Sequence, residues 1–372
     1  MQSFAPPQRL LLGPGPSNVP QRILEALARP TIGHLDPRFV GMMDELKTLL
    51  RQAFLTENAL TVPVSAPGSA GMEACFVNLI EPGDRVIVCQ NGVFGGRMKE
   101  NVLRVGATPV MVQDEFGCAI DLGKVEDALR ANPGVKALAF VHAETSTGVE
   151  SDAAALCALA HAHGALSIVD AVTSLGGVPL RVDAWGADAV YSGSQKCLSA
   201  PPGLSPLSFS ERAVAALKAR KTPVQSWFLD LSLVMAYWQG EGARSYHHTA
   251  PINMLYALHE ALLMLHEEGL EAAWARHRQN HLRLREGLER MGLELLVAES
   301  ARLPQLNAVR IPAGVEDLPV RRRLLDHYDI EIGAGLGSLA GKIWRIGLMG
   351  ASSHPDSVDR VLSALGEVLG RA

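Results

Sequence analysis

The sequence has no run of lysine or arginine, and no apolar stretch approaches the roughly 18 residues that a membrane-spanning helix needs. With a formal net charge of -5 and no basic run, the chain offers nothing that would follow a phosphate backbone, so nucleic acid is not expected as a partner. The first residues, 1–7, lack a basic region followed by an apolar core. We therefore expect a cytoplasmic protein with no membrane association.

Cysteine pairs and nucleotide-binding glycines are missing as well. The five cysteines are odd in number and contain no C-x-x-C pair, which argues against a disulfide framework and against a zinc site. No G-x-G-x-x-G opens a helix near the N-terminus, which disfavours a nicotinamide-binding enzyme. His247 and His248 are adjacent, and adjacent histidines point apart on most backbones, so we predict no metal site.

What the chain does have is length and a repeating pattern. Its 372 residues, 48% of them hydrophobic, suffice for a large domain and a smaller one. Short apolar strands are predicted at residues 60–64, 85–89, 108–112, 135–141, 166–169, 187–191 and 204–209. Helices are predicted at 70–80, 95–104, 122–131 and 152–163. Near-continuous apolar strands between helices predict an α/β fold whose mostly parallel sheet is covered on both faces, with ligands at the carboxyl ends of the strands.

The two ends of the chain follow other patterns. Residues 9–20 carry Pro14, Pro16 and Pro20 and cannot form a helix, so we predict an extended arm over residues 1–18 whose leucines a partner subunit would cover. Apolar residues at three- and four-residue spacing predict a helix at 37–55. A helical region at 253–291, broken at Gly269 and Gly287, leads to pieces at 293–297, 308–311, 315–327 and 343–346 and a last helix at 356–369. We place the large domain at 19–265 and a small α+β domain at 266–372.

Three features together point to chemistry. Lys196 follows the strand at 187–191, so its amine is delivered to a strand end, where it can form a Schiff base with an aldehyde cofactor. Such a cofactor needs a carboxylate for its ring nitrogen and a cradle for its phosphate. Asp170 closes an apolar strand, and Gly68 and Ser69 precede a helix. Alone, each has a plain alternative, namely a solvated lysine, an N-cap aspartate and an ordinary turn. Only the set of three favours a cofactor site.

Arg345 lies in an otherwise apolar strand. A buried guanidinium is costly unless an anion meets it, and the segment leaves two possibilities open. The anion is either a substrate carboxylate, bound through a bidentate fork, or the partner in a structural salt bridge.

Several motifs together resemble one family. They are Leu12 to Ser17 (LGPGPS), Glu144 to Gly148 (ETSTG), Val169 to Gly177 (VDAVTSLGG), Tyr191 to Lys196 (YSGSQK), Ala200 to Gly203 (APPG), Tyr246 to Thr249 (YHHT) and Arg345 to Leu348 (RIGL). With them the chain resembles, over nearly its whole length, the class V, fold type I aminotransferases that use pyridoxal 5'-phosphate, above all their alanine–glyoxylate and serine–pyruvate branch.

The resemblance implies a role for each of ten residues. Lys196 would form the Schiff base, Asp170 would pair with the ring nitrogen, and Arg345 would anchor the substrate carboxylate. Gly68, Ser69 and Gln195 would bind the phosphate. Thr145 would contact the phenolic side of the ring, and Phe94 would stack on the ring face. Many relatives stack tryptophan where this chain has Phe94, which keeps a π surface but no indole N–H. Tyr246 and Thr249 resemble residues that reach the phosphate of the neighbouring subunit, which implies a homodimer with shared active sites.

The implied reaction is a ping-pong transamination, from alanine or serine to glyoxylate or pyruvate. Ureidoglycine–glyoxylate and phosphonate-amine transaminases stay open as related alternatives. A lyase such as a cysteine desulfurase needs a nucleophilic cysteine late in the chain, and none follows Cys197. A noncatalytic cofactor-binding sensor is disfavoured because the lysine, the aspartate and the arginine are all present without a DNA-binding appendage.

Overall fold

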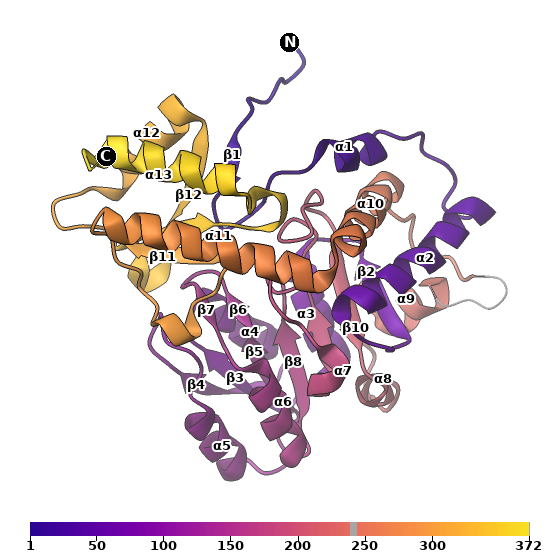
Figure 1. Cartoon of the computed structure of the whole chain (residues 1–372). Helices are drawn as coiled ribbons and strands as arrows, with labels where there is room; N and C mark the ends of the chain where they lie inside the picture. The colour runs from indigo at the N-terminus through magenta and orange to yellow at the C-terminus, as the bar shows by residue number, and fades with distance from the viewer. Residues whose placement is uncertain (239–243, 372) are drawn as a thin grey trace.

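The computed structural model describes residues 1–238 and 244–371, and a seven-stranded sheet forms its centre (Figure 1). The strand order is β2-β10-β9-β8-β5-β3-β4. The strands are β2 (Leu60–Val64), β3 (Arg85–Gln90), β4 (Thr108–Gln113), β5 (Ala137–Val141), β8 (Leu166–Asp170), β9 (Ala189–Tyr191) and β10 (Ser205–Phe209). Within this sheet β10 is antiparallel to both neighbours, and the other neighbouring pairs are parallel. The predicted mostly parallel sheet is thus confirmed.

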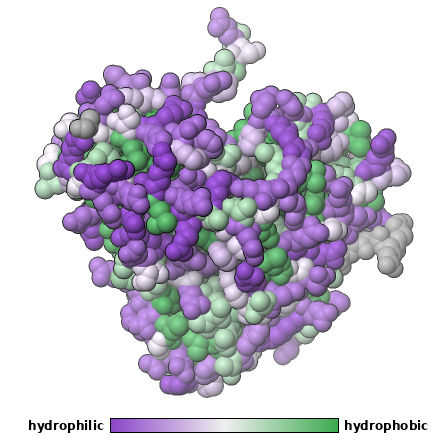
Figure 2. All heavy atoms as spheres, viewed as in Figure 1, coloured by the Kyte–Doolittle hydropathy of each residue, from purple (hydrophilic) through white to green (hydrophobic). Residues whose placement is uncertain are grey.

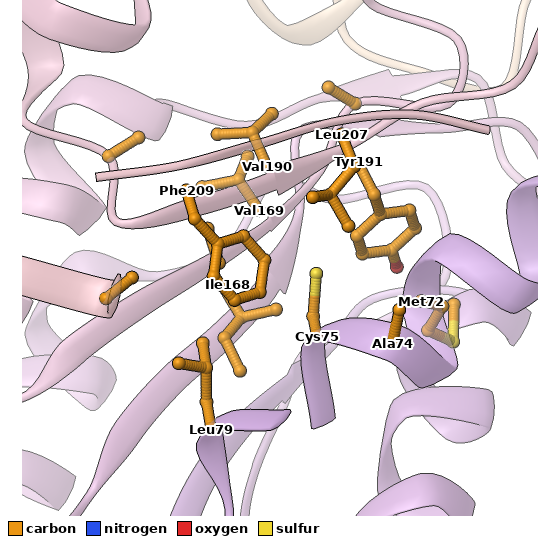
Figure 3. Packing of buried hydrophobic residues seen from close by; sticks show 14 of the residues in the cluster. Met72, Ala74, Cys75, Leu79, Ile168, Val169, Val190, Tyr191, Leu207 and Phe209 are labelled. Carbon is orange, nitrogen blue, oxygen red and sulfur yellow. The ribbon is translucent and has the colours of Figure 1, made fainter. Parts of the chain in front are cut away.

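Helices cover both faces of this sheet. Every residue of β2, β5, β8, β9 and β10 is buried, although successive side chains point to opposite faces. The covering helices are α2 (Pro37–Phe54), α3 (Gly68–Leu79), α4 (Val93–Arg104), α5 (Leu122–Ala131), α6 (Ala153–Ala162), α7 (Val182–Trp185), α8 (Glu211–Lys218) and α9 (Leu231–Trp238). Figure 3 shows one such contact, in which the ring of Tyr191 extends from the sheet toward Ala74 and Met72 of α3.

The starts of these helices differ in a way that matters for the site. The side chains of Asp36, Asp121, Asp152 and Ser210 cap α2, α5, α6 and α8 by accepting a backbone N–H of the first turn. Helices α3 and α4 begin after Pro67 and Gly92, which provide no such side chain. The starts of α3 and α4 lie at the carboxyl edge of the sheet, after β2 and β3.

A smaller α+β unit lies at one end of the molecule (Figure 1). Its four-stranded sheet has the order β1-β12-β13-β11, from β1 (Leu10–Leu12), β11 (Leu306–Arg310), β12 (Ile330–Ala334) and β13 (Ile343–Gly347). Helix α13 (Pro355–Leu369) packs with α11 (Leu270–Arg290) and with α12 (Asp317–Tyr328), while α10 (Ile252–Glu268) packs on α1 (Gln21–Leu27) and α2. A hairpin of β6 (Ala143–Glu144) and β7 (Val149–Glu150) and three short 3-10 turns, Glu299–Ala301, Gly337–Leu339 and Gly350–Ser352, complete the elements.

Two large clusters of buried apolar residues form separate cores. One cluster of buried residues extends from Phe39 to Ala273, and a second joins Leu12 to residues between Leu284 and Leu365. The limits predicted at residues 18, 265 and 266 remain a proposal. The face of the molecule seen in Figure 2 is mainly hydrophilic, with small apolar patches. Among the described residues, no helix combines the length and the apolar character that crossing a membrane requires.

Two predictions for the small domain are wrong. Gly287 does not break the helix, because α11 runs through it. A Cβ there would overlap Leu362 of α13, so this glycine allows the two helices to pack closely. Residues 293–297 form no strand and contribute one isolated bridge, from Leu295 to Val309. Strand β12 was not predicted, because its five residues include only a short apolar alternation.

The N-terminal arm is partly held by its own chain. Residues Leu10–Leu12 form β1, which pairs in parallel with β12, and Leu12 is buried in the core of the small domain. The chain itself therefore covers leucines that we expected a partner subunit to cover. Residues 1–8 are exposed and extend away from the body (Figure 1), so an interaction of this segment with a partner stays a prediction.

Candidate active site

Loops from several strands meet at one edge of the large sheet. Its parallel strands end at the same edge, which brings together the segments after β2, β3, β5, β8 and β9. They surround a cavity of about 170 Å³. Seven of the predicted site residues line it, namely Gly68, Ser69, Phe94, Thr145, Asp170, Gln195 and Lys196. The sheet topology therefore assembles residues that lie up to 128 positions apart in the chain.

Asp170 is held at the end of β8 by two hydrogen bonds. Its Oδ1 accepts the backbone N–H of Val172 at 2.9 Å, and its Oδ2 accepts the hydroxyl of Tyr191 at 2.8 Å. Burial raises the pKa of Asp170 to about 6, while the two hydrogen bonds and the nearby Lys196 oppose the rise. At neutral pH the group is therefore mainly a carboxylate inside the cavity.

Lys196 approaches the same cavity from the loop after β9. Its amine donates a hydrogen bond to the carbonyl of Pro14, and burial lowers its pKa to about 8. Gly15, with φ +105°, leaves room for the amine, because a Cβ at this position would overlap it. Ser17 donates to the carbonyl of Lys196 at 2.8 Å. The proline-rich segment thus packs directly against the lysine.

The start of α3 has the properties of an anion site. The helix begins at Gly68 without a side-chain cap, so its first N–H groups and the positive end of its dipole face the cavity that Gly68 and Ser69 line. On the other side, Gln195 Oε1 is buried and has no partner within the described part of the chain. The helix start suits a bound phosphate, whereas Gln195 could donate to a phosphate only through its side-chain NH₂ group, since Oε1 is an acceptor.

Arg345 comes from β13 of the small domain. It is 6% exposed, and it donates from Nε to the carbonyl of Ala334 at 2.6 Å and from Nη1 to the carbonyl of Thr145 at 3.1 Å. Burial lowers its pKa to about 10. Within residues 1–238 and 244–371 no carboxylate forms an ion pair with it. The structural salt bridge, one of the two possibilities left open by the sequence, is therefore not found there.

Tyr246 and Thr249 do not line this cavity. Tyr246 is 61% exposed, and its hydroxyl lies 3.3 Å from Thr249 Oγ1. His247 and His248, between them, do not point apart as expected, because their Nδ1 atoms lie only 2.8 Å from each other. The ring of His247 stacks on Trp227.

Four further residues at the site were not predicted to act there. Tyr191 is the register partner of Asp170, so the pairing of β8 with β9 identifies it. Arg97 lines the cavity with its guanidinium 4.7 Å above the ring of Phe94, a position that the three-residue helical spacing allows. Pro14 contributes its backbone carbonyl, which accepts a hydrogen bond from Lys196. Glu144, in the β6–β7 hairpin, accepts the backbone N–H of Phe94 at the start of α4. Neither of these two contacts has a local sequence signal.

Comparison with known proteins decides the family. The family described as Aminotransferase class-V matches residues 10–356. This chain belongs to the class-V aminotransferases. Alanine–glyoxylate aminotransferase from Oryctolagus cuniculus is 42% identical over 98% of this chain and 93% of the relative. (S)-Ureidoglycine–glyoxylate transaminase from Bacillus subtilis (strain 168) is 38% identical over 98% and 91%. The crystal structure of alanine–glyoxylate aminotransferase from Nostoc sp. superposes with a TM-score of 0.97 at 47% identity, covering 99% of this chain and 97% of that one.

Membership confirms the resemblance seen in the sequence motifs. The chain is an aminotransferase, and its α/β fold is that of the fold type I enzymes. The family and the fold imply pyridoxal phosphate as the cofactor. The residues that would hold it are taken up next.

Proposed function

We propose that this aminotransferase moves an amino group from a small amino acid, alanine or serine, to a small 2-oxo acid, glyoxylate or pyruvate, in a ping-pong reaction that uses pyridoxal phosphate. One observation carries the proposal: the amine of Lys196 and the carboxylate of Asp170 face one cavity that lies beside an uncapped helix start. The names of the relatives from Oryctolagus cuniculus and Nostoc sp. support alanine and glyoxylate.

The residues present fit the cofactor. The uncapped start of α3 with Ser69, together with the side-chain NH₂ group of the neighbouring Gln195, suits its phosphate. Asp170 would face the ring nitrogen, Phe94 would lie against the ring and Thr145 beside its phenolic oxygen. Because Tyr246 and Thr249 do not line the cavity of their own chain and Tyr246 is exposed, we assign them to the cavity of a second subunit in a homodimer.

When bound, the cofactor acts as an electron sink for negative charge at the Cα atom of the amino donor. Asp170, ionised above pH 6, would keep the ring nitrogen of the cofactor protonated. Lys196 has a pKa of about 8, so a substantial fraction of its amine is neutral near physiological pH and can take the Cα proton. Arg345 binds the donor carboxylate and thereby directs its Cα toward Lys196.

A second acceptor–donor pair also has support. The relative from Bacillus subtilis carries the name of a ureidoglycine–glyoxylate transaminase, and it is nearly as similar as the alanine enzymes. A cysteine-dependent lyase has no support, because burial raises the pKa of Cys197 to about 12 and no cysteine follows it in the sequence.

The test combines spectroscopy with a substrate screen. Purified protein is expected to show the absorbance of a lysine-bound pyridoxal group, and Lys196→Ala to lack it. Alanine, serine and ureidoglycine are then each supplied with glyoxylate or pyruvate. Conversion of alanine or serine supports the proposal, whereas conversion of ureidoglycine alone transfers it to the second pair. A colourless wild-type protein that converts none of them overturns it.

A further inference from the structure

Glu144 is a fully buried carboxylate beside the cavity, and the reaction described above does not use it. It sits at the end of β6, and its two oxygens contact different segments. Oε1 accepts the backbone N–H of Ser146 at 3.0 Å and the hydroxyl of Ser146 at 2.6 Å. Oε2 accepts the backbone N–H of Phe94 at 3.2 Å. The carboxylate therefore joins its own turn to the start of α4.

Helix α4 needs this external partner. Its N-cap residue, Gly92, has no side chain, and the first N–H groups of a helix must be satisfied from elsewhere. Ser146 Oγ accepts the N–H of Val93 at 2.9 Å, and Glu144 accepts that of Phe94. A Cβ on Gly92 would overlap the Glu144 carboxylate, so the glycine is what admits it. Negative charge at a helix start is also favoured by the helix dipole.

The same turn touches the substrate anchor. Thr145, between Glu144 and Ser146, lines the cavity. Its carbonyl accepts a hydrogen bond from Nη1 of Arg345 at 3.1 Å. On one side of the turn lies Phe94 in the large domain, and on the other lies Arg345 in the small domain. The turn is thus a direct connection between the two halves of the site.

We propose that Glu144 is a positioning residue that locks the start of α4 to the Thr145 turn, so that Phe94, Thr145 and Arg345 keep one fixed arrangement around the cofactor. This inference rests on the proposed function, since it assigns Phe94 to the ring and Arg345 to the substrate carboxylate. Burial raises the pKa of Glu144 to about 7, and its bonds from Ser146 oppose the rise. An ionised carboxylate is the better acceptor for all three donors.

The test uses Glu144→Gln, which keeps the shape but turns an NH₂ group toward one of the three donors. Amide hydrogen exchange of the cofactor-free protein is measured at residues 93–95, and the dissociation constant for pyridoxal phosphate is measured by titration. We expect about tenfold faster exchange at Phe94 and about tenfold weaker cofactor binding, the size of a lost helix cap. The melting temperature should not fall, because a buried charge is removed at the same time.

Two further variants make the result decisive. Glu150→Gln changes a carboxylate of the same hairpin that lies 3.6 Å from His142. Among the described residues it forms no hydrogen bond with α4, so the change should leave both quantities unchanged. Ser146→Ala removes the acceptor for Val93 and should speed exchange there. If Glu144→Gln fails to fold, Ser146→Ala carries the test alone.

Wild-type exchange at residues 93–95 together with wild-type cofactor affinity, in whichever of these variants folds, overturns the positioning role. An equal loss in Glu150→Gln overturns it as well. The exchange measurement needs no cofactor, so it tests the helix cap whether or not the protein binds pyridoxal phosphate. A wild-type protein that fails to bind pyridoxal phosphate counts against the proposed function alone.

Discussion

Two aspartates buried in the large sheet differ in how far their charge is satisfied. Asp188, just before β9, is 1% exposed and interacts with a backbone N–H and four side chains, from Ser167, Ser210, His161 and Arg212. Asp170, at the other end of the neighbouring strand, is 3% exposed and has one backbone N–H and one hydroxyl. No cation forms an ion pair with it within residues 1–238 and 244–371.

The difference indicates where the protein keeps capacity for a ligand. A buried carboxylate is costly unless partners compensate it, and Asp188 has them within its own chain. Asp170 is left with spare acceptor capacity in a cavity, and the same contrast separates Arg345 from Arg212, which is bonded to Asp188 and to two carbonyls. The saturated charges support the fold, whereas the less saturated Asp170 lines the cavity and Arg345 contacts Thr145, another residue of its lining.

The strongest test exchanges the two aspartates for asparagine. Asp170→Asn should lower kcat by roughly 10²–10³-fold, because a neutral amide no longer keeps the ring nitrogen protonated. The unfolding free energy of the cofactor-free protein at neutral pH should rise rather than fall, since a buried charge is removed. Asp188→Asn should instead cost about 2 kcal/mol of stability through weakened charged hydrogen bonds and leave kcat near wild type. Steady-state kinetics and urea unfolding separate the two. Equal effects of both changes on kcat would erase the contrast.

A pH scan of the cofactor-free protein sharpens the same point. The folded chain holds a proton on Asp170 up to a pKa of about 6, whereas the ordinary value is 3.8. Its contribution to stability is therefore complete below pH 4 and is lost as pH rises through 6, by about 3 kcal/mol for a shift of this size. The pKa of Glu144 is raised as well, so both carboxylates make the stability depend on pH. Subtracting the curve of Asp170→Asn from that of the wild type leaves the contribution of Asp170 alone. Parallel stability curves for the two proteins would contradict the assignment.

The arginine pair gives the next largest effect. Arg345→Lys removes the planar fork that would bind a carboxylate, so KM for the amino donor should rise about 30-fold with a smaller change in kcat. Arg212→Lys, at the saturated position, should leave KM unchanged and lower stability slightly. Initial-rate measurements over a range of alanine concentrations check both. An unchanged KM in Arg345→Lys would show that the substrate carboxylate binds elsewhere.

The smallest expected effect concerns the hydroxyl that holds Asp170. Tyr191→Phe removes a hydrogen bond of 2.8 Å to the carboxylate, which should raise the pKa of Asp170 further and reduce kcat/KM about tenfold near pH 6. The loss should shrink as pH rises, since the carboxylate then ionises in any case. Tyr328→Phe, which removes an exposed contact to Glu367 in the small domain, is the matched control. A loss that does not depend on pH would assign the hydroxyl a purely structural role.

Much of the large domain was predictable because its signals are local. Each of its seven strands was predicted to within two residues, since buried parallel strands read as short apolar runs between turns. The small domain was predicted less well. Gly287 is a helix breaker by propensity but lies where α11 meets α13, and only that packing explains it.

The site divides in the same manner. Lys196 and Asp170 could be recognised because motifs surround them, and the topology then brought them to one cavity. The links from Glu144 to Phe94 and from Lys196 to Pro14 join segments 50 and 182 residues apart. No spacing rule within the sequence connects such pairs.

By itself, the sequence determined the class of fold, the strands of the large sheet and the chemical groups available for catalysis, because periodicity and side-chain chemistry are properties of neighbouring residues. Only the tertiary structure decided which of the buried charges are satisfied and which remain open to a ligand. That distinction depends on partners supplied by other strands and loops, and those partners meet only when the chain has folded.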